Sequence, residues 1–205
     1  YFYFLFRHGD PHRIPPHLVN YRANLSALSS HGVEIVVAIN SVGAISESIS
    51  IGQLVIPDQL IDYTWGREHT IATTGEIESM HVDFTEPFDP DLSRDLSNVG
   101  SKLDLKILTG SVIGVTQGPR LESAAEIRKL KADGCNLVGM TSMPEAAIAR
   151  ELNLRYISIC VVSNVAAGLN ESKLSFADIR EVIELQSYSI CSLLKEYLRG
   201  LEYKN

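Results

Sequence analysis

The sequence predicts a single α/β domain in which helices flank a mixed, mostly parallel central sheet. Short apolar runs of strand length, such as 35–39 and 156–162, alternate with stretches of helical periodicity. Strands that alternate with helices are typical of crossover connections, which cover both faces of a parallel sheet. A chain of 205 residues, 45% of them hydrophobic and 21% charged, is suited to one domain over 1–205 with a sizeable core.

The first elements follow from composition and from helix-end signals. The apolar run Tyr1–Phe6 indicates a strand already under way, so we expect further residues before it. A Pro- and His-rich loop (9–17) precedes a helix over 18–31 that Gly32 closes. The β-branched run 33–39 is typical of a strand buried on both faces, and it ends at a turn formed by Asn40, Ser41, Val42 and Gly43.

The same reasoning predicts the remaining elements. Strands are expected over 54–61, 106–116 and 156–163, a long loop over 62–80, and helices over 91–103, 122–133, 142–152 and about 176–198. Ser142 is the expected N-cap of its helix, with Glu145 completing a capping box.

Composition excludes several classes of function. A formal net charge of −7 does not suit a protein that binds the phosphate backbone of nucleic acids. The longest apolar runs fall far short of the ~20 residues that cross a bilayer, so we expect no membrane association. Three cysteines without a CxxC pair, and no visible signal peptide, favour a cytoplasmic protein with reduced thiols.

Polar residues follow five expected strand ends, one of which belongs to a further short strand that ends before Met140. In open α/β sheets ligands bind beyond the carboxyl ends of strands, so these residues are expected to meet in one pocket. They are Arg7-His8, Asn40-Ser41, Thr116 to Glu122, Met140 to Ser142, and Ser163-Asn164. The alternative interpretation of His8, Asp10, His12 and His17 as a metal cluster is disfavoured by the adjacent prolines, and no metal is expected.

Four stretches resemble the trimeric nucleoside phosphorylase family, which includes purine nucleoside and 5'-methylthioadenosine phosphorylases. They are FRHGDPHRIPPHLVNYRAN, INSVGAI, TQGPRLESAAEIRKLKADGCNLVGMTSMPEAAIAREL and VVSNVAAG. Within the family the similarity is greatest to the bacterial S-methyl-5'-thioinosine phosphorylases. It extends over nearly the whole chain, and GPRLE with GMTSMPE at this spacing is highly specific.

The resemblance implies phosphate binding by Arg7, His8, Asn40, Ser41 and Thr141. A guanidinium, turn amides and a hydroxyl are suitable phosphate donors. It also implies a homotrimer, and no cofactor beyond inorganic phosphate as co-substrate. The family carries a Gly-rich phosphate loop at its N-terminus, and these 205 residues do not include it. We expect either that the loop precedes Tyr1 and is not resolved, or that this chain is a fragment.

The resemblance implies that Glu122 and Asn164 recognise the purine and assist catalysis. Glu122 would accept a hydrogen bond from N1–H of a 6-oxopurine, and Asn164 would contact O6 and N7. Adenine offers an acceptor at N1, so burying it against a carboxylate should cost a few kcal/mol. Two structural alternatives stay open: Glu122 as an early-helix carboxylate, and Asn164 as a plain turn residue.

The sugar site is also inferred from the resemblance. Phosphorylases of ordinary 6-oxopurine nucleosides carry a His near the start of the last helix, where this chain has Phe176 and Ala177. An apolar wall favours a methylthio group, although both residues could instead belong to the core. Met140 would pack on the ribose, and His81 would reach the 5' pocket of a neighbouring subunit. Further substrate contacts are expected from Val42, Gly43, Leu121, Ser163 and Ala166.

Three functions are therefore compared. The first is phosphorolysis of a 6-oxopurine nucleoside, with S-methyl-5'-thioinosine as the preferred substrate. The second is 5'-methylthioadenosine phosphorolysis, which would need Glu122 and Asn164 to be reoriented or neutralised. The third is a non-catalytic nucleoside-binding or structural member of the fold. Hydrolysis by water is disfavoured because it would leave the Arg7-His8 pair without a purpose.

Overall fold

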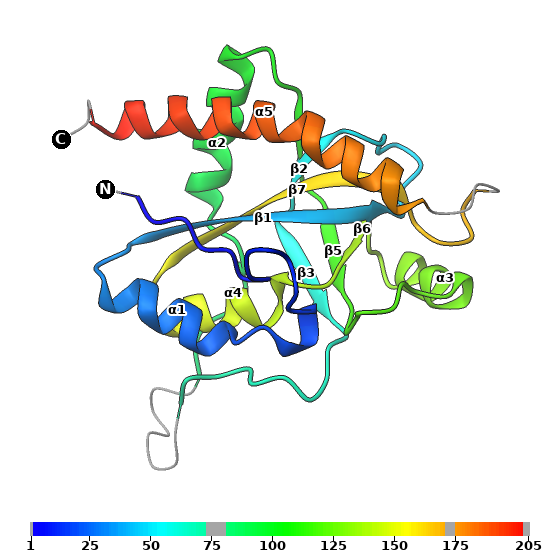
Figure 1. Cartoon of the computed structure of the whole chain (residues 1–205), viewed down its shortest axis with the longest axis horizontal. Coiled ribbons are helices and arrows are strands. Elements are labelled where there is room, and N and C mark those ends of the chain that lie inside the picture. The colour runs from blue at the N-terminus through cyan, green and yellow to red at the C-terminus, as the bar shows by residue number, and fades with distance from the viewer. Residues whose placement is uncertain (1, 73–80, 171–174, 203–205) are drawn as a thin grey trace.

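A computed structural model describes residues 2–72, 81–170 and 175–202. In these residues seven strands form one sheet in the order β3-β5-β6-β1-β7-β2-β4 (Figure 1). The strands are β1 (Ile35–Ala44), β2 (Leu54–Ile56), β3 (Gln59–Asp62), β4 (Ile107–Thr109), β5 (Val112–Val115), β6 (Leu137–Gly139) and β7 (Arg155–Val165). The helices are the short η1 (Pro16–Leu18), α1 (Tyr21–Ser30), α2 (Pro90–Lys102), α3 (Ala124–Ala132), α4 (Ser142–Glu151) and α5 (Phe176–Glu202).

The long strands β1 and β7 form the centre of the sheet. They run parallel, from Ile35 opposite Arg155 to Ala44 opposite Val165, with one register shift between Val42 and Gly43. The pairs β3–β5, β5–β6 and β2–β4 are also parallel, whereas β6–β1 and β7–β2 are antiparallel. The predicted mixed, mostly parallel sheet is confirmed.

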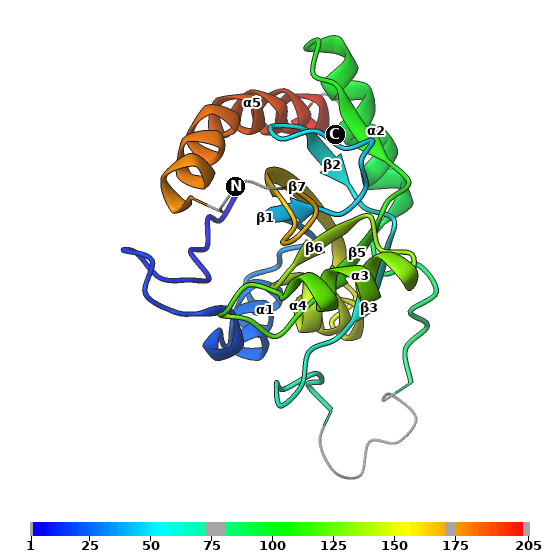
Figure 2. The ribbon, with the colours of Figure 1, turned by 90° about the vertical axis from the view of Figure 1, so that its right-hand side faces the viewer.

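Helices cover both faces of the sheet. In two views at right angles, α1 and α4 lie on one side and α2 and α5 on the other, while α3 lies beside β5 and β6 (Figures 1 and 2). Leu96 of α2, Leu193 of α5 and Ile157 of β7 are fully buried in the main core. The apolar periodicity that predicted these elements therefore reflects real burial between helices and sheet.

Helix ends match the expected signals at several positions. Asn20 accepts a hydrogen bond from the Ala23 amide at the start of α1, and Gly32 follows that helix with φ of +74°. At α3 the capping box is formed by Ser123 and Glu126. Glu122 therefore lies before the helix, and its interpretation as an early-helix carboxylate is wrong.

The expected strand at the N-terminus is not formed. Residues 2–6 have no regular structure, and the side chains of Phe2, Phe4 and Phe6 are largely exposed. High β propensity makes a strand only where a neighbouring strand offers hydrogen bonds. Along β1, β7 pairs with the whole strand, whereas β6 pairs only with Gly43 and Ala44. Residues 2–6 form no ladder with the open part of that edge, and the contact there is a side-chain one, from Arg7 to the Ile39 carbonyl.

The expected turn at Asn40–Gly43 is also wrong, because β1 continues through it. Asn40 pairs with Cys160 and Ser41 with Val161 of β7. The polar side chains find partners inside the sheet: Ser158 for Asn40, and Ser163 for Ser41. Polar residues in this run therefore do not end the strand.

The expected capping box at Ser142 and Glu145 does not form. The residue before α4 is Thr141, which makes no side-chain cap, and Met143 has an extended backbone (φ −121°, ψ 137°). A residue that precedes proline is driven out of the helical region, and Pro144 follows Met143. Glu145 instead turns toward Arg7 and Tyr156.

The predicted long loop after β3 is found as far as the structure describes it. Residues 63–72 have no regular structure, and the remainder of the predicted loop, 73–80, lies outside the described residues. Within the described part of the chain, no helix combines the length and apolar character needed to cross a bilayer.

Candidate active site

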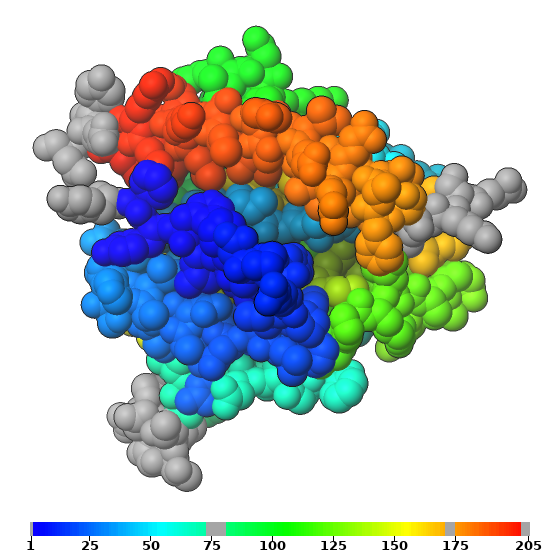
Figure 3. All heavy atoms as spheres, in the orientation of Figure 1, coloured from blue at the N-terminus to red at the C-terminus, as the bar shows by residue number. Residues whose placement is uncertain are grey.

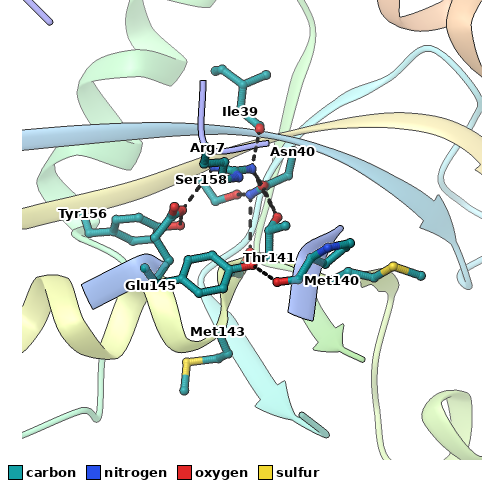
Figure 4. Close-up of polar contacts among 12 residues, drawn as sticks. Arg7, Ile39, Asn40, Met140, Thr141, Met143, Glu145, Tyr156 and Ser158 are labelled. Atoms are coloured by element: carbon teal, nitrogen blue, oxygen red, sulfur yellow. Dashed lines mark hydrogen bonds and ion pairs between the residues drawn. The ribbon is translucent and has the colours of Figure 1, made fainter. Parts of the chain in front are cut away.

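Arg7 is the centre of a cluster beside the middle of β1 and the end of β6. The N-terminal segment that carries it lies across the face between α1 and α5 (Figure 3). Its Nη2 donates to the Ile39 carbonyl at 2.8 Å, to Thr141 Oγ1 at 3.2 Å and to Asn40 Oδ1 (Figure 4). Its Nη1 forms an ion pair of 3.2 Å with Glu145 Oε2. Three of the predicted phosphate-binding residues are thus in direct contact.

Two buried residues, Glu145 of α4 and Tyr156 of β7, hold Arg7 in place. The Tyr156 hydroxyl donates to Glu145 Oε2 at 2.8 Å, and both residues are buried. Burial acts to lower the pKa of Arg7, but the Glu145 carboxylate and smaller contributions from neighbouring groups such as Tyr156 together outweigh it, and the pKa is raised. Burial holds the pKa of Tyr156 well above its ordinary value, so the phenol stays a neutral donor.

Asn40 connects three elements through its amide. Its Oδ1 accepts from Thr141 Oγ1 at 2.7 Å, and its Nδ2 donates to Ser142 Oγ at 3.3 Å and to Ser158 Oγ. The amide is fully used and 4% exposed. Asn40 therefore positions Thr141 and Arg7, and its own side chain has no free donor to offer.

His8 lies beside Arg7 but points along the N-terminal loop. Its Nδ1 is 2.8 Å from the Ile14 carbonyl, and its ring stacks on His12 with centroids 4.5 Å apart. Since a carbonyl can only accept, Nδ1 carries the proton. Burial lowers the pKa of His8, and Arg7 lowers it further, so in the neutral ring Nε2 is an acceptor.

Ser41, Ser163 and Asn164 form a second polar group across β1 and β7. Ser41 Oγ donates to Ser163 Oγ at 2.8 Å, and Ser163 Oγ lies 3.0 Å from Asn164 Oδ1. Asn164 Nδ2 donates to the Val165 carbonyl at 2.9 Å. A Cβ on Gly43 would stand only 3.2 Å from that nitrogen, so the small residue makes room for the amide.

Glu122 lies in a hollow of about 250 Å³. Thr116 Oγ1 donates to its Oε1 at 2.5 Å. The hollow is lined by Tyr63, Trp65, Thr116, Gln117, Gly118, Arg120, Glu122, Glu126, Lys129 and Leu130. Neither Arg7 nor Asn164 lines it. The predicted residues thus form three groups: one beside the middle of β1 and the end of β6, one across β1 and β7, and one after β5.

The remaining predicted residues lie at varied positions. Val42 and Ala166 are buried, whereas Leu121 is partly exposed. Phe176 is 77% exposed, and Ala177 is exposed beside it at the start of α5, so neither is a core residue. His81 is exposed at the edge of the described residues. In the described part of the chain no group of three or more His, Cys, Asp or Glu is arranged to hold a metal ion.

Sequence reasoning missed Glu145 and Tyr156, and it also missed Arg67. The sequence predicts a capping role for Glu145 and a buried strand position for Tyr156. Arg67 lies in the loop after β3 and donates to four backbone carbonyls, three of which follow β5 or β6 and one of which is in the start of α4. One signal pointed to it, because loops of this length in compact domains are usually functional or mobile.

Comparisons with known proteins identify the family of this chain. The phosphorylase superfamily matches residues 2–199. A probable S-methyl-5'-thioinosine phosphorylase of Xylella fastidiosa is 51% identical over 82% of this chain and 71% of its own length. The 6-oxopurine nucleoside phosphorylase of Pyrococcus furiosus is 40% identical over 93% of this chain and 74% of its own. A methylthioadenosine phosphorylase of Schistosoma mansoni, solved with adenine, has a TM-score of 0.90 at 27% identity, covering 97% and 76%.

Proposed function

Since this chain belongs to the phosphorylase superfamily, we propose that it catalyses phosphorolysis of 6-oxopurine nucleosides. The preferred substrate is S-methyl-5'-thioinosine, and the products are hypoxanthine and 5-methylthioribose 1-phosphate. The observation that carries the proposal is the position of Glu122. Its carboxylate lies in the hollow after β5, and β5 is the neighbour of β6, which leads to the Arg7 cluster. Relatives named for 6-oxopurine substrates support it at 38–51% identity.

Phosphate binds at Arg7 and Thr141, with His8, Asn40 and Ser41 completing the site. The Arg7 Nε–H is buried and has no hydrogen-bond partner within the described residues. Buried donors are rarely left unpaired, so an anion is a natural acceptor for this group. The neutral His8 accepts a hydrogen bond from a protonated phosphate oxygen through Nε2. Asn40 serves mainly to hold Thr141 and Arg7.

The purine binds against Glu122 and Asn164. Glu122 accepts from N1–H of a 6-oxopurine, which takes the place of the Thr116 hydroxyl as its donor. Asn164 turns its amide from Val165 toward O6 and N7 of the base. Adenine would place its N1 lone pair against the carboxylate, and this mismatch supports a 6-oxopurine over 5'-methylthioadenosine.

Catalysis comes from positioning and electrostatics. The glycosidic bond breaks through an oxocarbenium-like transition state, while negative charge grows on the purine. A hydrogen bond from Asn164 to N7 strengthens as that charge develops, and Glu122 holds the base in place. Phosphate at Arg7 attacks the anomeric carbon and stabilises the cation. Neither a metal nor an organic cofactor takes part.

The sugar and subunit contacts complete the proposal. Met140 packs on the ribose, and Val42, Gly43, Leu121, Ser163 and Ala166 contact the nucleoside. The exposed Phe176 and Ala177 form an apolar wall for the methylthio group. A cytoplasmic homotrimer brings His81 of one subunit to the 5' pocket of the next.

The test compares inosine, S-methyl-5'-thioinosine and 5'-methylthioadenosine, each with and without phosphate. Release of hypoxanthine that requires phosphate, fastest from S-methyl-5'-thioinosine, supports the proposal. Faster release of adenine would favour the methylthioadenosine reaction, and release without phosphate would indicate a nucleosidase. Binding without turnover would leave a non-catalytic member of the fold.

A further inference from the structure

Arg67 joins two loops that leave the sheet at neighbouring strands. Its Nη2 donates to the carbonyls of Thr116 (3.2 Å) and Gln117 (2.7 Å), which follow β5. Its Nη1 donates to the carbonyl of Met140 (2.8 Å), which follows β6, and to that of Met143 (2.6 Å), in the extended start of α4 that comes next. Its Nε donates to Gln117 Oε1 at 3.2 Å. Every N–H-bearing nitrogen of the guanidinium therefore contacts one of these two loops.

Each of the two loops carries groups assigned to a different part of the substrate. The loop after β5 holds Thr116, whose hydroxyl contacts Glu122 on the purine side. The loop after β6 holds Met140 and Thr141 on the ribose and phosphate side. Between them the sheet provides only short parallel pairing, Ile113–Val115 against Leu137–Gly139. Beyond it, one backbone bond from the Thr116 amide to the Gly139 carbonyl continues the connection.

We propose that Arg67 is a positioning residue that fixes the purine side of the site relative to the phosphate side. The inference rests on the proposed function. Arg67 holds the spacing between nucleoside and phosphate, on which in-line attack depends, without touching either reactant. A displacement of about 1 Å in such a site can cost about 100-fold in rate.

The requirement is for a guanidinium rather than for positive charge alone. Its planar fork offers five N–H donors in a fixed geometry, whereas a lysine ammonium offers three from a single atom and cannot span both loops. The Tyr21 ring of α1 lies 5.8 Å from the Arg67 Cζ and supports the group. Tyr21 is itself held, because its hydroxyl donates to the Pro16 carbonyl at 2.9 Å.

The experiment compares Arg67→Ala and Arg67→Lys with wild type, and uses Arg22→Ala as the matched control. Arg22 pairs with Glu68 of the same loop at the surface, where such a pair contributes little. We expect kcat for S-methyl-5'-thioinosine to fall about 100-fold in both Arg67 variants, with smaller changes in both KM values. Millimolar guanidinium chloride should restore part of kcat in Arg67→Ala only. Arg22→Ala should keep the wild-type kcat.

A second measurement needs no substrate. Trp65 is the only tryptophan of the chain, and its backbone N–H donates to Gln117 Oε1 at 3.1 Å. In Arg67→Ala the loop is released, so we expect the anisotropy of Trp65 fluorescence to fall and guanidinium to restore it. Unchanged anisotropy, or a kcat close to wild type in Arg67→Ala, would overturn the inference. If wild type cleaves no nucleoside, the proposed function fails, and the anisotropy alone decides whether Arg67 holds the loops.

Discussion

At the scale of single residues, Asn164, the candidate base-binding residue, already has hydrogen-bond partners within β7. Its amide is occupied by its neighbours, since Oδ1 accepts from Ser163 and Nδ2 donates to the Val165 carbonyl. Both bonds are local, one to each neighbour in the chain. Under the proposed function, a purine would replace them as the partner of this amide.

For Asn164→Asp we expect the ratio of kcat/KM for 5'-methylthioadenosine to that for S-methyl-5'-thioinosine to rise. A carboxylate accepts a hydrogen bond from the 6-amino group of adenine but repels O6 of hypoxanthine. A hydrogen bond to a charged group contributes about 1.5–3 kcal/mol, so the ratio should change roughly 10- to 100-fold. Initial rates with both nucleosides measure the ratio. An unchanged ratio would contradict direct contact between Asn164 and the base.

His8 makes stability depend on pH. Its pKa in the folded protein is lowered from 6.5 by burial and by Arg7 and His12, so the unfolded chain binds the proton more readily. Its contribution to the free energy of unfolding is complete above pH 6.5 and is lost as the pH falls through the lower, folded value. Urea unfolding at several pH values should show a weaker pH dependence in His8→Gln. Identical profiles for the two proteins would contradict a buried, neutral His8.

At the scale of elements, α4 begins without a side-chain cap, and Glu145 in its first turn forms a buried ion pair with Arg7 instead. Met143 is extended ahead of Pro144, so the first turn of α4 cannot be capped in the usual way. Glu145 then lies beneath β1 and β7 and meets Arg7 and Tyr156. The element boundary thereby becomes part of the candidate phosphate site.

Glu145→Ala should lower the free energy of unfolding by about 3–5 kcal/mol, because it leaves the Arg7 charge buried without a partner. Glu145→Gln keeps an acceptor for Tyr156 and should lose less, which leaves a folded variant for comparison. The control is Glu47→Ala, whose exposed pair with Lys131 contributes about 1 kcal/mol at most. Urea unfolding monitored by circular dichroism measures all three, and equal losses at positions 145 and 47 would contradict this role.

At the scale of the whole molecule, the order of strands decides which groups meet. The neighbours β5, β6, β1 and β7 bring together residues from four distant parts of the chain. Helices lie on both faces of the sheet that holds these strands (Figure 2). Ligand binding should therefore stabilise the entire domain rather than one loop.

Phosphate at about 100 times its dissociation constant should stabilise the folded protein by about 2.7 kcal/mol. For a domain of this size, that raises the melting temperature by roughly 5–10 °C. Scanning calorimetry with phosphate, and with chloride at equal ionic strength, measures the shift. Arg7→Ala should reduce it, whereas Arg94→Ala, which removes an exposed ion pair on α2, should not. An equal shift in Arg7→Ala would remove Arg7 from the phosphate site.

The sequence by itself determined the class of fold, nearly all helices and strands, and the family. Continuous apolar runs predicted β1 and β7, apolar periodicity predicted α5, and short motifs such as GPRLE indicated the family. These signals are local, because propensity, periodicity and motif spacing depend on neighbouring residues alone.

Only the tertiary structure decided which partners the polar residues take. Asn40 stays in a strand because Ser158, 118 residues away, accepts from its amide, and Glu145 pairs with Arg7 across 138 residues. The run 2–6 has strand composition but pairs with no strand in the described part of the chain. A hydrogen bond or ion pair forms only where both groups are in contact. For residues far apart in the sequence, the tertiary fold decides which groups are in contact. Residue type alone therefore could not predict the Glu145 and Arg67 contacts.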